Sequence, residues 1–157
     1  MATGVLVLCF GKATRLIRYL DELGGADAKE YDARIRFGFE TTTDDAEGEP
    51  RTEREAVGTL PREQLSAVLA SFVGEIQQLP PDFSAKKVAG KRAYTLARRG
   101  EEVGLKPVAV HVARAQLLEV DDDCARVQFA CSRGTYIRAL ARDLGRALGL
   151  GAHLVAL

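Results

Sequence analysis

Arginines spaced along the segment at residues 131–145, CSRGTYIRALARDLG, suit the binding of an anion. The segment places a strand end, a glycine turn and a helix start in succession, and backbone N–H groups exposed at such a junction bind anions. Arg138, Arg142 and Arg146 then recur at intervals of four, which puts them on one face of a helix. Two interpretations fit this pattern, an anion site or an ordinary solvated helix face.

A second candidate surface is basic and aromatic. Residues 84–100, SAKKVAGKRAYTLARRG, carry six Lys or Arg and no acid, whereas residues 40–55 hold seven acids against two arginines. RNA requires phosphate neutralisation and a ring on which a base can stack, and Tyr94 supplies such a ring. The segment therefore indicates an RNA-binding surface, although charge alone would also fit a solvated face.

Tyr31 is the third candidate. In KEYDARIRFGFET (29–41) it shares a phase with Ile35 and Phe37, so its ring lies on the apolar face of the expected strand, near its start. A core tyrosine and a residue facing a site both fit this position. Cys131 has no histidine in its own segment to activate it, so we do not expect a cysteine nucleophile.

Composition excludes several classes of protein. The chain has 157 residues, 46% of them hydrophobic, which suits one domain over residues 1–157. Its longest apolar run is six residues, too short for a membrane span, and nothing indicates export. Three cysteines without metal-binding spacing and two isolated histidines predict reduced thiols, a cytoplasmic location and no metal site.

Hydrophobic periodicity predicts an α+β fold with a mixed, largely antiparallel sheet flanked by helices. Thr135 is the expected N-cap of the last helix, and residues 41–50 are expected to form a mobile acidic loop. The expected elements, in order, are a buried strand at 5–10, a helix at 13–23, a half-buried strand at 29–41, a helix from Pro61 with a core stripe reaching Ile76, a short helix or turn at 92–99, a hairpin of strands at 108–120 and 125–132, and a helix at 137–148.

Four segments in order resemble the bacterial tRNA pseudouridine synthases of the TruB family, which isomerise the T-loop uridine at tRNA position 55. They are ATGVLVLCFGKATRL, KEYDARIRFG, PPDFSAKKVAGKRAYTLARRG and CSRGTYIRALARDLG, and the similarity extends to the closing GAHLVAL. The resemblance implies a pseudouridine synthase-like catalytic fold, the T-loop and T-stem of tRNA as partner, no cofactor, no metal, no membrane contact and a monomer at full length.

The resemblance also concerns the two ends of the chain. In the family, Gly-Thr-Leu-Asp-Pro-Leu-Ala-Thr-Gly precedes the first strand and its aspartate is catalytic. Ala2, Thr3 and Gly4 match the end of that motif, which places the aspartate two positions before Met1. We therefore expect an incomplete catalytic core that also stops before the family's C-terminal RNA-binding region. Such a core would be inactive alone, with an unpaired sheet edge, exposed apolar surface and a tendency to self-associate. A module that binds or folds tRNA without chemistry is the alternative.

Residue roles follow from the same resemblance. Tyr31 matches an active-site tyrosine that packs against the flipped base, and Arg138 matches the arginine that pairs with the missing aspartate, so we expect Arg138 to lack its partner. Tyr136 and Leu157 match substrate contacts, and Asp45 lies in a loop that approaches the substrate. The residues matching the family's basic RNA-binding segment are Lys86, Lys87, Lys91, Arg92 and Tyr94.

Overall fold

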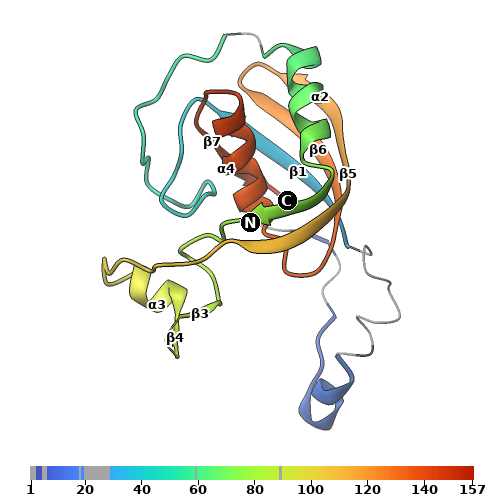
Figure 1. Cartoon of the computed structure of the whole chain (residues 1–157), viewed down its shortest axis with the longest axis vertical. Coiled ribbons are helices and arrows are strands. Elements are labelled where there is room, and N and C mark those ends of the chain that lie inside the picture. The colour runs from blue at the N-terminus through green and yellow to red at the C-terminus, as the bar shows by residue number, and fades with distance from the viewer. Residues whose placement is uncertain (1–2, 5–6, 18, 20–28, 59, 89) are drawn as a thin grey trace.

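A five-stranded sheet in the order β2-β5-β6-β1-β7, with every neighbouring pair antiparallel, organises the molecule (Figure 1). The computed structural model describes residues 3–4, 7–17, 19, 29–58, 60–88 and 90–157. The expected α+β class and largely antiparallel sheet are confirmed. The sheet strands are β1 (Lys29–Phe37), β2 (Gly74–Gln78), β5 (Val108–Asp121), β6 (Cys124–Cys131) and β7 (Ala152–Ala156).

Two helices cover one face of this sheet. Helix α4 (Ile137–Ala147) packs on β7 and β1, and α2 (Arg62–Ser71) packs on β5. The alternation in β1 buries Ala33, Ile35 and Phe37 beneath them. The intervening polar residues of β1 are exposed on the opposite face, where they form cross-strand ion pairs such as Arg126–Asp32. This division of a sheet into one core face and one solvated face is typical of antiparallel sheets.

A small lobe projects from the sheet at the lower left of Figure 1. It consists of the β3–β4 hairpin (Lys87–Val88 and Lys91–Arg92), helix α3 (Ala93–Ala97) and the following loop. The lobe has its own apolar cluster, formed by Ala93, Leu96 and Val103. We call residues 84–105 the basic lobe.

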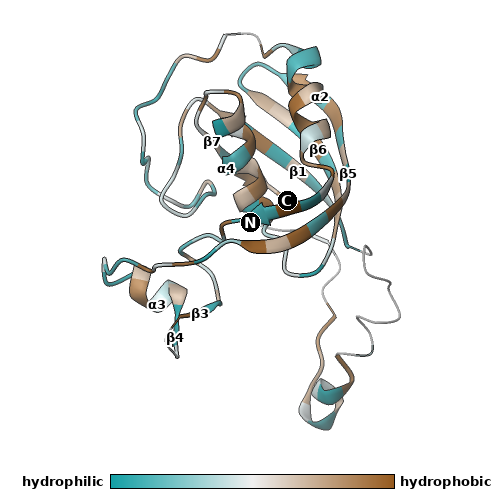
Figure 2. Cartoon of the chain, viewed as in Figure 1, coloured by the Kyte–Doolittle hydropathy of each residue, from teal (hydrophilic) through white to brown (hydrophobic). Residues whose placement is uncertain are grey.

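The strand expected at residues 5–10 is absent from the part of it that the structure describes. Residues 7–10 have no regular structure, and a 3₁₀ helix (Gly11–Leu16) forms the first part of the expected helix, with Ile17 and Tyr19 α-helical after it. Val7, Leu8 and Phe10 are 66–79% exposed, and Figure 2 shows the apolar colouring of this projecting segment. A strand needs a neighbour for its backbone and a surface for its side chains, and these residues meet neither. This segment exposes apolar surface, as expected, while residues 18 and 20–23 of the expected helix lie outside the described residues.

The second helix is shorter than its apolar pattern predicts. It ends at Ser71, and Gly74 has a φ of 107°, which a helix does not allow. The chain then reverses and pairs with β5, so that Ile76 lies opposite Val110 in a strand. The hydrophobic period alone could not distinguish a longer helix from a helix followed by strand β2, because apolar residues continue at a spacing of three or four across the turn. Among the described residues, no helix is both long and apolar enough to cross a membrane.

Candidate active site

Arg138, in the first turn of α4, is held by three oxygen atoms from two loops. Its Nη1 donates to the carbonyl oxygen of Thr43 (2.9 Å) and to Oδ2 of Asp45 (3.1 Å), and its Nη2 donates to the carbonyl oxygen of Phe83 (2.9 Å). The Arg138 side chain is 26% exposed, and that of Asp45 is 23% exposed. The expectation that Arg138 lacks a partner is therefore wrong, because Asp45 reaches it from the acidic loop.

Asp45 is itself fixed on its other oxygen. Its Oδ1 accepts hydrogen bonds from Oγ1 of Thr43 (2.5 Å) and from the backbone N–H of Glu47 (3.1 Å). Three donors thus hold this carboxylate in one orientation. The loop that carries it is tied to the edge of β7, since Leu154 N donates to Asp44 O (3.1 Å) and Ala46 N donates to Leu154 O (2.9 Å). The edge of β7 is therefore partly covered by this loop.

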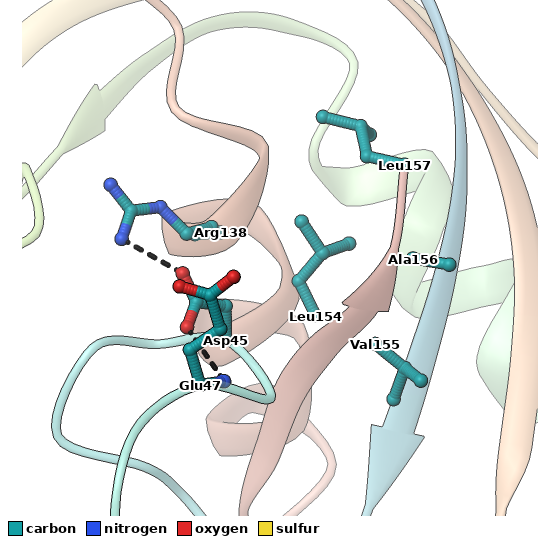
Figure 3. A pocket seen from close by; sticks show the side chains of 7 residues that line it. All are labelled: Asp45, Glu47, Arg138, Leu154, Val155, Ala156 and Leu157. Atoms are coloured by element: carbon teal, nitrogen blue, oxygen red, sulfur yellow. Dashed lines mark hydrogen bonds and ion pairs between the residues drawn. The ribbon is translucent and has the colours of Figure 1, made fainter. Parts of the chain in front are cut away.

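A pocket of about 200 Å³ opens beside this pair. Its walls are Asp45, Glu47, Arg138 and residues 154–157 at the end of β7. Figure 3 shows the Arg138–Asp45 pair on one side, with Leu154 and Leu157 on the other. A charged pair facing an apolar wall suits a flat ligand with polar edges, such as a nucleobase.

Tyr31 borders a neighbouring groove of about 630 Å³, and Leu157 lines both hollows. The structure thus brings Tyr31 and Leu157 together and also Leu157 and Arg138, but it does not place Tyr31 in the walls of the Arg138 pocket. Tyr31 is half-buried on β1, opposite Phe129 of β6. Burial, with a smaller effect of Cys131, raises the pKa of the Tyr31 phenol above its ordinary value. The phenol is therefore neutral at physiological pH, which suits stacking rather than proton abstraction.

The other two arginines of α4 also pair with the acidic loop. Arg142 donates to Oδ2 of Asp44 (2.8 Å), and both side chains are 5% exposed. Arg146 donates from Nε and Nη2 to the two oxygens of Glu40 (2.6 and 2.7 Å). We call the pairs Arg138–Asp45, Arg142–Asp44 and Arg146–Glu40 the arginine ladder. The ladder decides against the solvated-face interpretation for Arg138 and Arg142, and it ties Asp44 and Asp45 of the loop expected to be mobile to α4.

Burial and the arginine ladder shift the pKa values of Asp44 and Glu40 in opposite directions. Burial raises the pKa of Asp44 above its ordinary value, although Arg142, Arg138 and Arg146 act in the opposite direction. The hydrogen bond from Arg146 lowers the pKa of Glu40. The sequence contains one signal for the pairing of these acids with α4. Glu40 and Asp44 are four positions apart, the same spacing as their partners Arg142 and Arg146.

Comparison with known proteins identifies the family of the chain. The profile of the TruB family pseudouridylate synthase (N terminal domain) matches residues 1–137. The chain belongs to the TruB family. It is 46% identical over 157 residues to the tRNA pseudouridine synthase B of Francisella philomiragia and 50% identical to that of Stutzerimonas stutzeri. All of the chain is covered in both matches, and it spans about half the length of these relatives, 51% and 50%.

A solved structure also resembles this TruB-family chain in fold. The crystal structure of a Cbf5–Nop10–Gar1 complex contains a chain that is 26% identical, with a TM-score of 0.63. The match covers 99% of the chain described here and 35% of the other.

Tyr136 occupies the N-cap position of α4, where Thr135 was expected. Its own side chain makes no capping hydrogen bond, and it lines neither hollow. The backbone of Tyr136 is instead bound by the side chain of Gln78 from β2 (2.9 and 3.1 Å). The role of Gln78 was not predicted from the sequence. The available signal was only that a polar residue stands at the end of a partly apolar segment.

The basic lobe begins directly after Phe83, a residue that contacts Arg138. Phe83, whose carbonyl oxygen accepts from Arg138, is followed by Ser84, whose carbonyl oxygen accepts from Tyr94 N (3.0 Å). The guanidinium carbons of Arg92 and Arg98 lie 5.9 and 5.7 Å from the centre of the Tyr94 ring. Lys87, Lys91 and Arg92 are exposed to solvent, and Lys86 is half-buried.

Proposed function

We propose that residues 1–157 form the core of the catalytic domain of a tRNA pseudouridine synthase that isomerises the T-loop uridine at position 55. The observation that carries the proposal is the partly buried Arg138–Asp45 pair facing the apolar wall of Leu154 and Leu157. Family membership and the name of the curated relatives, tRNA pseudouridine synthase B, support the same reaction class.

The reaction defines what the site must do. The bond between C1′ and N1 of uridine breaks, a bond between C1′ and C5 forms, N1 gains a proton and the proton on C5 leaves to water. No oxidant and no cofactor is required. The base must first leave its stack and enter a pocket. We propose that Leu157 and Tyr31 pack against the extruded nucleotide while Arg138 and Asp45 present fixed charges to its polar edges.

Asp45 does not serve as the nucleophile in this proposal. Its two oxygens already accept hydrogen bonds from Thr43, Glu47 and Arg138, so attack by this carboxylate would break the contacts that position it. Asp44 is likewise held by Arg142, so in this proposal neither of these two acids is the catalytic aspartate that the TruB resemblance implies.

Release of tritium tests the proposal. A T-arm stem-loop RNA labelled at C5 of its uridines is incubated with the full-length protein from its source, and water-borne tritium is counted. We expect release that disappears when cytidine replaces the uridine at position 55. No release from the uridine RNA would overturn the proposed activity. A parallel sample of residues 1–157 alone is expected to release none, because neither Asp45 nor Asp44 acts as the nucleophile in this proposal.

RNA binding by the basic lobe gives a separate prediction. Replacing Lys87 and Lys91 with glutamine is expected to weaken binding of the stem-loop RNA and to reduce the slope of log K against log salt by roughly 0.7–0.9 for each phosphate that is no longer neutralised. The reason is that each lysine that neutralises a phosphate releases a counterion. Filter binding at several salt concentrations measures both quantities. Lys12→Gln, which removes an exposed lysine outside the lobe, is the control, and equal slopes for both variants would refute the assignment.

A further inference from the structure

Gln78 is a fully buried amide at the end of β2, with 0% of its surface exposed. Its Oε1 accepts a hydrogen bond from the backbone N–H of Tyr136 (2.9 Å), and its Nε2 donates to the carbonyl oxygen of Tyr136 (3.1 Å). The two bonds together fix both the position and the orientation of one peptide segment. That segment is where α4 begins.

The chain after Gln78 continues along the same helix. The carbonyl oxygen of Leu79 accepts from Nη2 of Arg142 (2.8 Å), and that of Phe83 accepts from Nη2 of Arg138 (2.9 Å). Residues 78–83 therefore hold α4 at its start and at two of its arginines. Of these three interactions, the one made by Gln78 is the only one in which residues 78–83 supply a side chain, so it can be altered without touching Arg138 or Arg142.

We propose that Gln78 is a positioning residue for the active site. By holding Tyr136, the N-cap of α4, it sets the start of the helix and thereby the position of Arg138, two residues after Tyr136. The inference rests on the proposed function. It extends the site to a residue that touches neither pocket. A displacement of about 1 Å in a group that orients substrate can cost about 10²-fold in rate, and the helix start determines where the guanidinium meets the pocket.

The chemistry of an amide suits this role because it donates and accepts at once. Leucine at position 78 would leave the N–H of Tyr136 without its acceptor. The carbonyl oxygen of Tyr136 would keep the bond from Leu140 N (3.1 Å). Glutamate is nearly the same shape as glutamine, and its protonated form reproduces both hydrogen bonds. Its ionised form would instead place a carboxylate oxygen against the carbonyl oxygen of Tyr136.

Two variants therefore test the inference, Gln78→Leu and Gln78→Glu, with Gln77→Glu as the matched control. Gln77 precedes Gln78 on the same strand and is exposed. Tritium release is measured in the full-length protein under single-turnover conditions with saturating RNA, and RNA affinity is measured separately. Rates are expressed per folded molecule, so that a loss of stability alone does not change them.

We expect Gln78→Leu to lower the rate constant by roughly 10- to 100-fold while RNA affinity changes less than about twofold, since phosphate contacts dominate affinity. We expect the rate of Gln78→Glu relative to the unaltered protein to be near one at low pH and to fall as pH rises, because a buried carboxyl has a raised pKa and is protonated at low pH. Gln77→Glu should keep a constant ratio.

Three outcomes would count against the inference. A Gln78→Glu rate ratio that is independent of pH, and equal to that of Gln77→Glu, would show that the amide does not position the site. A fall in RNA affinity that accounts for the whole loss in Gln78→Leu would assign the residue to binding instead. Inactivity of the unaltered protein would overturn the proposed function itself, and the inference with it, and is distinguished by that control.

Discussion

Replacement of Arg138 with lysine is expected to lower the single-turnover rate constant for pseudouridine formation by roughly 10²–10³-fold, the range seen when one fixed donor is removed from a catalytic site. The guanidinium reaches Thr43 O and Asp45 Oδ2 through one nitrogen and Phe83 O through the other. A lysine ammonium keeps the charge but cannot span both loops, because it lacks the planar fork. The substitution therefore separates geometry from charge.

Affinity for RNA should change little in this variant, since the net charge of the protein is preserved. Tritium release at saturating RNA and filter binding measure the two quantities separately. Arg146→Lys is the matched control, because Arg146 lies two turns along the same helix, is half-exposed and lines neither hollow. If Arg138→Lys retained more than about a third of the rate, charge alone would suffice and the fork would have no role.

Replacement of Arg142 with methionine is expected to lower the free energy of unfolding by about 3–5 kcal/mol. The change keeps an unbranched side chain but leaves the Asp44 carboxylate buried without its ion-pair partner, and it removes the donor to Leu79 O (2.8 Å). Urea denaturation of the chain at neutral pH measures the loss. Arg34→Met is the control: Arg34 pairs with Asp121 where both side chains are more than half exposed, and exposed pairs contribute less than about 1 kcal/mol.

Two further observations would distinguish this mechanism from a simple packing defect. Asp44→Asn in the Arg142→Met background should restore part of the loss, because no buried charge then remains. The defect of Arg142→Met alone should also shrink as pH falls. Burial raises the pKa of Asp44 in the folded state, so the folded protein binds a proton that the unfolded chain releases, and acid relieves the cost. A loss that is independent of pH and of Asp44→Asn would refute the buried-charge explanation.

Local periodicity was sufficient for much of the fold. The strict alternation around Ile35 and Phe37 predicted β1, the acidic turn at residues 121–123 predicted the β5–β6 hairpin, and the apolar spacing from Ile137 to Leu148 predicted α4. These patterns are reliable because burial on one face of a regular element imposes its own period on the sequence. Periodicity gave the wrong secondary structure at residues 7–10 and at β2, because the conformation of these segments depends on which part of the protein packs against them.

In the site too, individual residues were predicted from the sequence, whereas their partners were not. Tyr31, Arg138 and Leu157 were identified through the TruB resemblance, and the structure places them around two adjoining hollows that share Leu157. The partner of Arg138 was not found in advance, because Asp45 is 93 residues away in the sequence. Gln78 was missed for a similar reason, since its partner Tyr136 is 58 residues away.

The sequence by itself determined the family, the class of fold and the residue types available for chemistry. Motif order, hydrophobic period and charge depend only on the order of residues along the chain. Only the tertiary structure decided which charges meet. Residues 40–45 and α4 form the arginine ladder because the acidic loop runs beside β7, on which α4 packs. At Arg138 and Arg142, burial turns what would be weak surface pairs into fixed, partly dehydrated ones, and burial is a property that no short stretch of sequence contains.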